Sequence, residues 1–151
     1  DACKTGAGVF VLVRTSNPGS ADFQTLGEPP LWERVAAKVR EWGESCVEGD
    51  GGLLPVGAVV GATHPELLAR ARELMPRTPL LLPGYGAQGA SASDCRPCFD
   101  VQGMGALVCS SRGVTYPTSG AGEEEAYDAD FVAFIRQNAL RFREEIARSL
   151  A

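Results

Sequence analysis

The amino-acid sequence predicts an α/β fold in which four parallel strands alternate with helices. Short apolar runs rich in β-branched residues alternate along the chain with segments of helical periodicity. Each loop rich in Gly or polar residues follows one of the apolar runs. The chain has 151 residues, of which 44% are hydrophobic and 22% charged, which suits one globular core better than two. We therefore expect a single domain over residues 1–151.

The predicted strands are short apolar runs bounded by Gly or Pro residues. They cover residues 8–14, 57–60, 79–82 and 104–109. The first of them lacks a strict alternation of apolar and polar residues, so we expect both of its faces to be buried.

The predicted helices have apolar residues at helical spacing. They cover residues 31–42, 66–75, about 93–101 and about 124–149. Pro30 stands near the first turn of the first helix, Thr63 is expected to cap the second, and Pro76 ends it. The last helix is amphipathic, with five apolar residues expected on its buried side: Phe131, Phe134, Ile135, Phe142 and Ile146.

This order of elements allows either an open doubly wound sheet or a barrel. Two loops suited to phosphate follow the third and fourth strands, and in a (β/α)8 barrel phosphate is held after strands seven and eight. The placement fits if the four strands are the last four of eight. We therefore expect the C-terminal half of a TIM barrel.

Charge and composition argue against several classes of protein. The net charge is −5 and no run of Lys and Arg is present, as a nucleic-acid binder would need. Apolar stretches are far shorter than the roughly 20 residues that span a bilayer. No signal peptide is visible, and five scattered cysteines do not form a disulfide framework, so we expect a reducing, cytoplasmic location. The missing initiator Met suggests a piece of a longer protein.

The loop at residues 84–89 and the segment around Arg112 are the strongest candidates for binding an anion. Gly84, Gly86 and Gly89 let backbone N–H groups approach a phosphate, although a tight turn that only needs positive φ would use the same glycines. Arg112 can pair bidentately with phosphate oxygens, and Gly113 directly after it favours a backbone close to a ligand. Together the two loops favour binding over a surface role for Arg112.

Other motifs are weaker. Ser16 lies in a Thr-Ser-Asn-Pro-Gly segment whose composition alone indicates a turn. Cys95 and Cys98 have the spacing of a redox motif, but they fall in a weak helix and no second Cys pair completes a zinc site, so we interpret the spacing as incidental. His64 is the only histidine, which makes a hydrolase triad improbable, and no metal site is expected.

Four motifs resemble class 2 orotidine 5'-phosphate decarboxylases in order and spacing. They are GVFVLVRTSNPG at 8–19 followed by DFQ at 22–24, VGATHPE at 60–66, LPGYGAQG at 82–89 and SSRG at 110–113. The resemblance covers about residues 6–117, whereas residues 118–151 fit the family's last helix in position only.

The resemblance implies a (β/α)8 barrel that is active as a dimer, uses no cofactor and converts orotidine 5'-phosphate to UMP in pyrimidine biosynthesis. By position it implies that Ser16 contacts the pyrimidine ring, Pro83 packs beside the base, Gln88 bridges toward the phosphate and Arg112 binds it with nearby backbone amides. The implied substrate-binding set is Ser16, Pro83, Gln88, Gly89, Arg112 and Gly113. Three neighbours, Asn17, Tyr85 and Ser111, are further candidates.

Two departures separate this sequence from the family pattern. Tyr85 and Ala90 stand where the family usually has a small apolar residue and Gly, and the Tyr85 hydroxyl would either donate to the ligand or obstruct it. The family's Asp-x-Lys-x-x-Asp proton-transfer motif is absent, because Asp1 and Lys4 have the wrong spacing. We therefore expect no catalytic residue in this chain.

Three hypotheses follow. The chain is the substrate-binding half of a decarboxylase and inactive alone, or a non-catalytic phosphate-binding or assembly module, or part of another barrel enzyme with a phosphorylated substrate. Four parallel strands would leave two unpaired edges and an uncovered face. We therefore expect the chain to pair with an N-terminal half-barrel or with a second copy of itself.

Overall fold

The computed structural model describes residues 2–47, 52–86, 88–115 and 131–151. Its centre is a sheet of four strands: β1 (Val9–Arg14), β2 (Val56–Val60), β3 (Leu80–Pro83) and β4 (Ala106–Cys109). The strands lie in the order β1-β2-β3-β4, and every neighbouring pair is parallel. The predicted α/β class is therefore confirmed, with each strand within two residues of its predicted bounds at either end.

Helices connect the strands as predicted. The longer ones are α2 (Leu31–Glu44), α3 (Pro65–Leu74) and α6 (Phe131–Leu150). Short turns complete the described chain: η1 (Ala2–Thr5), η2 (Pro18–Ser20), α1 (Ala21–Gln24), α4 (Ala92–Cys95), η3 (Arg96–Cys98) and α5 (Arg112–Thr115). The first seven residues of the predicted last helix, 124–130, lie outside the described residues.

Two helix predictions are corrected by local chemistry. Thr63 does not cap α3, because His64 occupies the N-cap position and the buried Thr63 hydroxyl has no hydrogen-bond partner. The segment predicted as a helix over residues 93–101 contains one α-helical turn and one 3-10 turn. Ser91 and Asp94 form a capping box that begins this segment at Ala92, one residue earlier than predicted.

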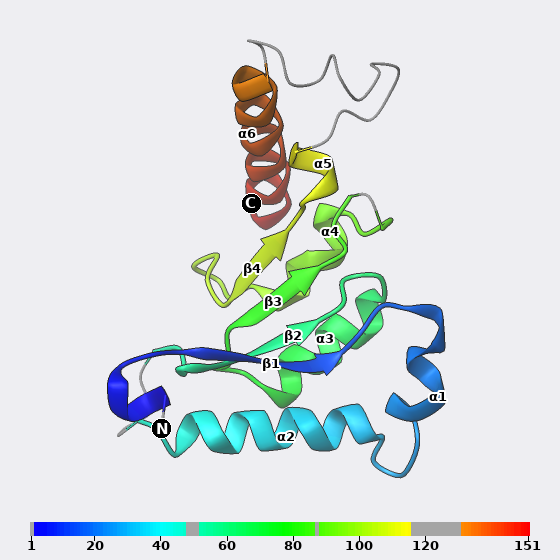
Figure 1. Cartoon of the computed structure of the whole chain (residues 1–151), viewed down its shortest axis with the longest axis vertical. Helices are drawn as coiled ribbons and strands as arrows, with labels where there is room; N and C mark the ends of the chain where they lie inside the picture. The colour runs from blue at the N-terminus through cyan, green and yellow to red at the C-terminus, as the bar shows by residue number, and fades with distance from the viewer. Residues whose placement is uncertain (1, 48–51, 87, 116–130) are drawn as a thin grey trace.

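The main core lies between one face of the sheet and helices α2 and α3 (Figure 1). The helices contribute Trp32, Val39 and Leu68, and the sheet contributes residues such as Val60 and Leu82. This face of the sheet is buried from solvent because the crossover helices of parallel strands pack directly on it.

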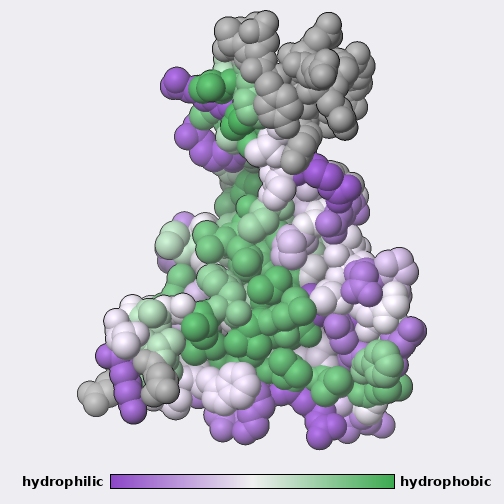
Figure 2. All heavy atoms as spheres, in the orientation of Figure 1, coloured by the Kyte–Doolittle hydropathy of each residue, from purple (hydrophilic) through white to green (hydrophobic). Residues whose placement is uncertain are grey.

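The opposite face of the sheet is open. Phe10, Leu12 and Leu107 are 45%, 58% and 56% exposed. The strand register places Leu12 beside Val59, Val59 beside Leu81 and Leu81 beside Leu107, so these side chains share one face. Figure 2 shows the hydrophobic surface that runs across the strands on this side. The prediction that β1 is buried on both faces is wrong, because the helices of the described residues cover only one of them.

Helix α6 stands against the end of the sheet near β4 and α5 (Figure 1). None of its residues is fully buried, and Phe142 and Ile146 pack on the core only in part. The five apolar residues predicted on its buried side are all half-buried. The helix is therefore attached by partly buried contacts with α4, η3 and α5.

The cysteines differ from the sequence prediction in one respect. Cys3 and Cys46 form a disulfide with a Cα–Cα distance of 5.8 Å, although they are 43 residues apart in the chain. The sequence interpretation, in which the scattered cysteines form no disulfide framework, did not anticipate this bond, which forms because the fold brings η1 next to the end of α2. Cys95 and Cys98 are free and fully buried, and burial raises their pKa values to about 11 and about 12. Both remain protonated thiols, which agrees with the interpretation that their spacing is incidental.

Within the described ranges, no helix is both long and apolar enough to cross a membrane.

Candidate functional site

A small pocket opens at the carboxyl ends of β3 and β4, the edge of a parallel sheet where ligands usually bind. Its volume is about 100 Å³. The residues that line it come from the ends of the two strands and the loops that follow them: Pro83, Gly84, Tyr85, Gln88, Cys109, Ser111 and Arg112. The structure thus gathers five of the nine expected site residues in one place, namely Pro83, Tyr85, Gln88, Ser111 and Arg112.

Arg112 supplies the positive charge of this pocket. It is the first residue of α5 and its side chain is exposed. Its guanidinium makes no hydrogen bond or ion pair within the part of the chain that the structure describes. A guanidinium without an internal partner at the mouth of a pocket is suited to an anionic ligand.

Ser16 reaches the pocket through Gln88. The Ser16 hydroxyl donates a hydrogen bond to the Gln88 side-chain oxygen at 3.1 Å, across 72 residues of sequence. Gly84, at φ +107°, lets the same Gln88 oxygen lie 3.0 Å from the position that a Cβ atom would take. The loops after β1 and β3 therefore meet at a polar contact beside the pocket.

Gly61 at the end of β2 makes this approach possible. A Cβ atom built on Gly61 would lie 2.8 Å from the Ser16 Cβ and 2.9 Å from the Ser16 backbone nitrogen. Such distances are shorter than carbon atoms tolerate, so only Gly allows the Ser16 loop to sit here. The sequence reasoning missed this role, because no pattern in the chain relates Gly61 to Ser16.

Gln24 holds the start of the Ser16 loop. Its side-chain oxygen accepts hydrogen bonds from the Thr15 backbone N–H at 3.1 Å and from the Arg14 guanidinium at 2.7 Å. Its amide donates to the Thr15 hydroxyl at 3.0 Å. This residue belongs to the motif quoted above, but its positioning role becomes visible only in the structure.

Tyr85 turns its hydroxyl away from the ligand side. The hydroxyl donates to the Glu145 carboxylate of α6 at 2.7 Å, and only 4% of the residue is exposed. Burial and the nearby Glu145 carboxylate raise the Tyr85 pKa, so the phenol stays a donor. Of the two expected roles, donation to a ligand is disfavoured by this contact.

The remaining predicted residues flank the pocket without lining it. Gly89 is exposed in the β3 loop, and Asn17 is exposed next to Ser16. Gly113 is buried behind Arg112, against the Phe142 ring.

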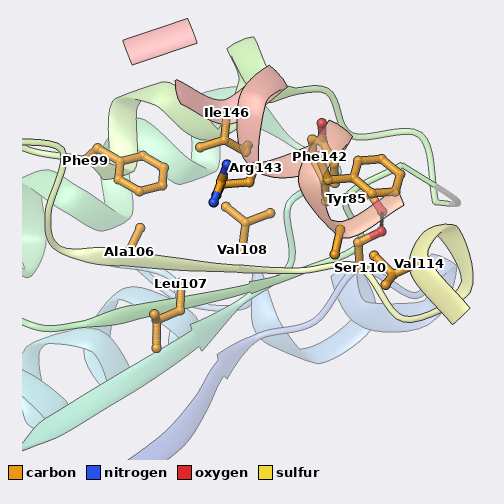
Figure 3. Close-up of a pocket in the computed structure, with 11 residues that line it drawn as sticks. Tyr85, Phe99, Ala106, Leu107, Val108, Ser110, Val114, Phe142, Arg143 and Ile146 are labelled. Carbon is orange, nitrogen blue, oxygen red and sulfur yellow. Dashed lines mark hydrogen bonds between the residues drawn. The ribbon is translucent and has the colours of Figure 1, made fainter. Parts of the chain in front are cut away.

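A larger cavity of about 460 Å³ lies between β4 and α6 (Figure 3). Its walls are mainly apolar, with Phe99, Val108 and Ile146 among them, and Arg143 is the charged residue on them. Apart from Tyr85 it contains none of the predicted site residues. The smaller pocket is the better candidate site because it combines polar side chains and loop glycines with Arg112, a cation that has no partner among the described residues.

The lysines of the chain lie away from the strand ends that form the pocket. The sequence contains two lysines, Lys4 and Lys38. Lys4 lies in η1 before β1, and Lys38 lies on α2, where it pairs with Glu41 at 2.7 Å. Neither is at the carboxyl end of a strand. No group of three or more His, Cys, Asp or Glu residues in the described ranges is arranged to hold a metal ion.

Comparison with known proteins identifies relatives of the whole chain. No protein-family model matches it. The orotidine 5'-phosphate decarboxylase of Deinococcus radiodurans is 48% identical over 149 residues, which is 99% of this chain and 50% of the relative. The enzyme of that name from Caldicellulosiruptor saccharolyticus is 50% identical over 111 residues, 72% of this chain and 36% of the relative. The chain is a homologue of the orotidine 5'-phosphate decarboxylases. It spans at most about half the length of these curated relatives.

Solved structures agree with this assignment. The OMP decarboxylase of Leishmania donovani superposes with a TM-score of 0.66 and 32% identity over 95% of this chain and 48% of that one. A Toxoplasma gondii protein assigned to orotidine-monophosphate decarboxylase gives a TM-score of 0.71 and 31% identity, over 95% of this chain and 51% of that one. The four-stranded sheet therefore corresponds to about half of an orotidine 5'-phosphate decarboxylase barrel.

Proposed function

We propose that this chain is the substrate-binding half of an orotidine 5'-phosphate decarboxylase, the enzyme that converts orotidine 5'-phosphate to UMP and CO2. The observation that carries the proposal is the pocket at the ends of β3 and β4. It brings Arg112 together with the Gly-rich loop and with Gln88, which is bonded to Ser16. The choice of orotidine 5'-phosphate as the ligand is supported by the names of the relatives.

Each side of the pocket has its own task in this proposal. Arg112 binds the phosphate, assisted by Ser111 and by backbone N–H groups near Gly89 and Gly113. Ser16 reads the polar edge of the pyrimidine, with Asn17 beside it, and Pro83 packs against the ring. Gln88 lies between the two ends of the nucleotide, and its bond to Ser16 supports that intermediate position.

The chemistry itself requires residues outside this chain. Loss of CO2 leaves a carbanion-like centre, which a positioned acid must stabilise and protonate. Neither lysine of the chain lies at the carboxyl end of a strand, and in this proposal the proton donor comes from another segment or subunit. The phosphate lies away from the carbon that loses CO2, and the free energy of its binding would help to lower the barrier at that carbon. We therefore propose that the chain alone is inactive.

Complementation tests this proposal directly. The chain is mixed with an N-terminal half-barrel that carries Asp-x-Lys-x-x-Asp, and the loss of orotidine 5'-phosphate absorbance is followed. Turnover is expected in the mixture and in neither half alone. The same mixture with Arg112→Ala should turn over more slowly at low substrate concentration. No turnover with both halves folded would refute the proposal.

A second function is supported by the absence of a lysine at the pocket. A non-catalytic half-barrel would bind the nucleotide or phosphate and act as an assembly module. It would show UMP binding in the mixture without any turnover. A barrel enzyme acting on another phosphorylated substrate is less well supported, because the Ser16–Gln88 contact suits a pyrimidine rather than a sugar phosphate.

A further inference from the structure

One aromatic ring on α6 touches both loops of the proposed phosphate site. A Cβ atom built on Gly86, in the loop after β3, would lie 3.6 Å from the Phe142 Cε1. A Cβ atom built on Gly113, in the loop after β4, would lie 2.7 Å from the Phe142 Cζ. The ring therefore lies beside both glycines. It fills the space that a Cβ atom of Gly113 would need, whereas a Cβ atom at Gly86 would be in ordinary van der Waals contact with it.

The Phe142 ring is held by neighbours from the same two loops. It packs edge-to-face on Tyr85, with 5.1 Å between ring centroids and 78° between ring planes. Tyr85 is fixed in turn by its hydrogen bond to Glu145, one turn further along α6. The Ser110 hydroxyl donates to the Tyr85 carbonyl oxygen at 3.4 Å and so joins the β4 loop to the β3 loop directly. Figure 3 shows Tyr85, Phe142 and Ser110 together at one end of the larger cavity.

This contact is one of several that attach α6 to the domain, together with its contacts to α4, η3 and α5. No residue of α6 is fully buried, and Phe142 is one of two α6 side chains that pack on the core cluster. The Tyr85 ring and hydroxyl both contact α6, through Phe142 and Glu145, and a small side chain could not make these contacts.

We propose that Phe142 is a positioning residue that sets the spacing between loop 84–89 and loop 110–113, and that the Tyr85–Glu145 hydrogen bond keeps it in place. The inference rests on the proposed phosphate site. A phosphate held by Arg112 and by amides of both loops requires donors at fixed separation, and displacement of a donor by about 1 Å removes most of its contribution. Phe142 touches neither nucleotide nor Arg112 in this scheme and acts through the two glycines.

The test compares two ligands that differ only in the phosphate. UMP and uridine are titrated against the chain in its native assembly, as wild type and as Phe142→Ala. The variant should weaken UMP binding at least tenfold and change uridine binding less than twofold. Tyr85→Phe, which removes one hydroxyl and keeps the ring, should also weaken UMP binding more than uridine binding, but by a smaller factor than Phe142→Ala. Ile146→Ala is the matched control, because it also truncates a half-buried α6 side chain in the core but does not face the glycines.

Hydrogen exchange separates this inference from the proposed function. The Gly86 N–H is bonded to the Ala90 carbonyl and the Val114 N–H to the Ser111 carbonyl, which gives one reporter in each loop. Both should exchange faster in Phe142→Ala without ligand, and not in Ile146→Ala. If wild type binds UMP no more tightly than uridine, the phosphate site is refuted, and the exchange rates still decide whether Phe142 orders the loops. Equal loss of UMP and uridine affinity, or unchanged exchange in both loops, would overturn the inference.

Discussion

Arg112 carries the charge on which the proposed phosphate site depends. Because its guanidinium has no hydrogen-bond or ion-pair partner among the described residues, its removal should not disturb the fold. We expect Arg112→Ala to weaken UMP binding by more than about 2 kcal/mol, roughly 30-fold, as for a lost charge-assisted contact. Uridine affinity and the unfolding midpoint should stay unchanged, as titration and thermal unfolding would show. Unchanged UMP affinity would remove Arg112 from the site.

A substitution of Gly61 tests the proposed contact between Ser16 and the pyrimidine base. Alanine here would push the Ser16 backbone away, because the added Cβ lies 2.8 Å from the Ser16 Cβ. We expect Gly61→Ala to weaken the binding of UMP and the binding of uridine by the same factor, about tenfold, because overpacking typically costs about 1–3 kcal/mol. Gly19→Ala is the control, because its Cβ would meet its nearest neighbours at 3.6 and 3.8 Å. A loss confined to UMP would contradict a pyrimidine role for Ser16.

The site could be predicted from the sequence only where a residue acts through its own side chain in a recognisable motif. Arg112 and the loop glycines were expected from their residue types, and Ser16 and Gln88 from a family resemblance. Gly61, Gln24 and Phe142 were not, because each acts by touching a residue that lies far away in sequence. Such contacts depend on which loops the sheet brings together, and local patterns carry no information about that.

At the scale of elements, Arg72 fastens α3 to the β4 side of the sheet. Its guanidinium donates to the carbonyl oxygens of Cys98, Thr78 and Gly105 at 3.1, 3.0 and 2.8 Å. Burial of this cation lowers its pKa, and the nearby Cys98 and Asp100 offset this lowering only in part. We expect Arg72→Met to lower the free energy of unfolding by about 2–4 kcal/mol, because several carbonyl groups lose their donor. Unfolding of wild type and variant in denaturant measures this difference in free energy.

Arg70 on the same helix provides the matched control. Its exposed guanidinium pairs with Glu33 at 3.0 Å and with Glu73 at 3.1 Å. Surface pairs contribute about 0–1 kcal/mol. Arg70→Met should therefore lower the free energy of unfolding far less than Arg72→Met. An equal effect would show that the buried hydrogen bonds of Arg72 stabilise the fold no more than a surface ion pair does.

The disulfide between Cys3 and Cys46 ties η1 to the end of α2. Closing a loop of 43 residues stabilises the folded chain by up to about 4 kcal/mol in the chain-entropy model. We expect a reductant to lower the unfolding temperature of wild type and to leave that of Cys3→Ser/Cys46→Ser unchanged. The same midpoint for wild type with and without reductant would show that the bond contributes no stability.

The elements themselves were predictable to different degrees for physical reasons. Strands such as β2 are short apolar runs with Gly or Pro at both ends, and these patterns place them well. The α3 start was misassigned to Thr63 because a hydroxyl at a cap position does not ensure that it bonds to the backbone. The segment from Ala92 to Cys98 has Pro97 inside it, so a regular helix cannot continue through it.

At the scale of the whole molecule, the open face of the sheet is the dominant feature. Phe10, Leu12 and Leu107 form an apolar surface that no described helix covers, and β1 and β4 are both edge strands. Such surfaces on one chain usually indicate an interface. The half-length match to the curated relatives supports a second half-barrel as the partner, with a second copy of this chain as the alternative.

Substitution of Leu12 tests whether the open face of the sheet binds a partner. Leu12 is 58% exposed, so Leu12→Lys should cost the isolated fold little but place a charge inside the interface. We expect wild type to sediment as an assembly larger than the monomer, and Leu12→Lys to raise the dissociation constant at least tenfold, because one lost buried Leu corresponds to about 1.5–3 kcal/mol. Val132→Lys, at a residue that is 76% exposed at the start of α6 and does not belong to the sheet, should leave association unchanged. A well-folded wild-type monomer at all concentrations would show that the open face needs no partner.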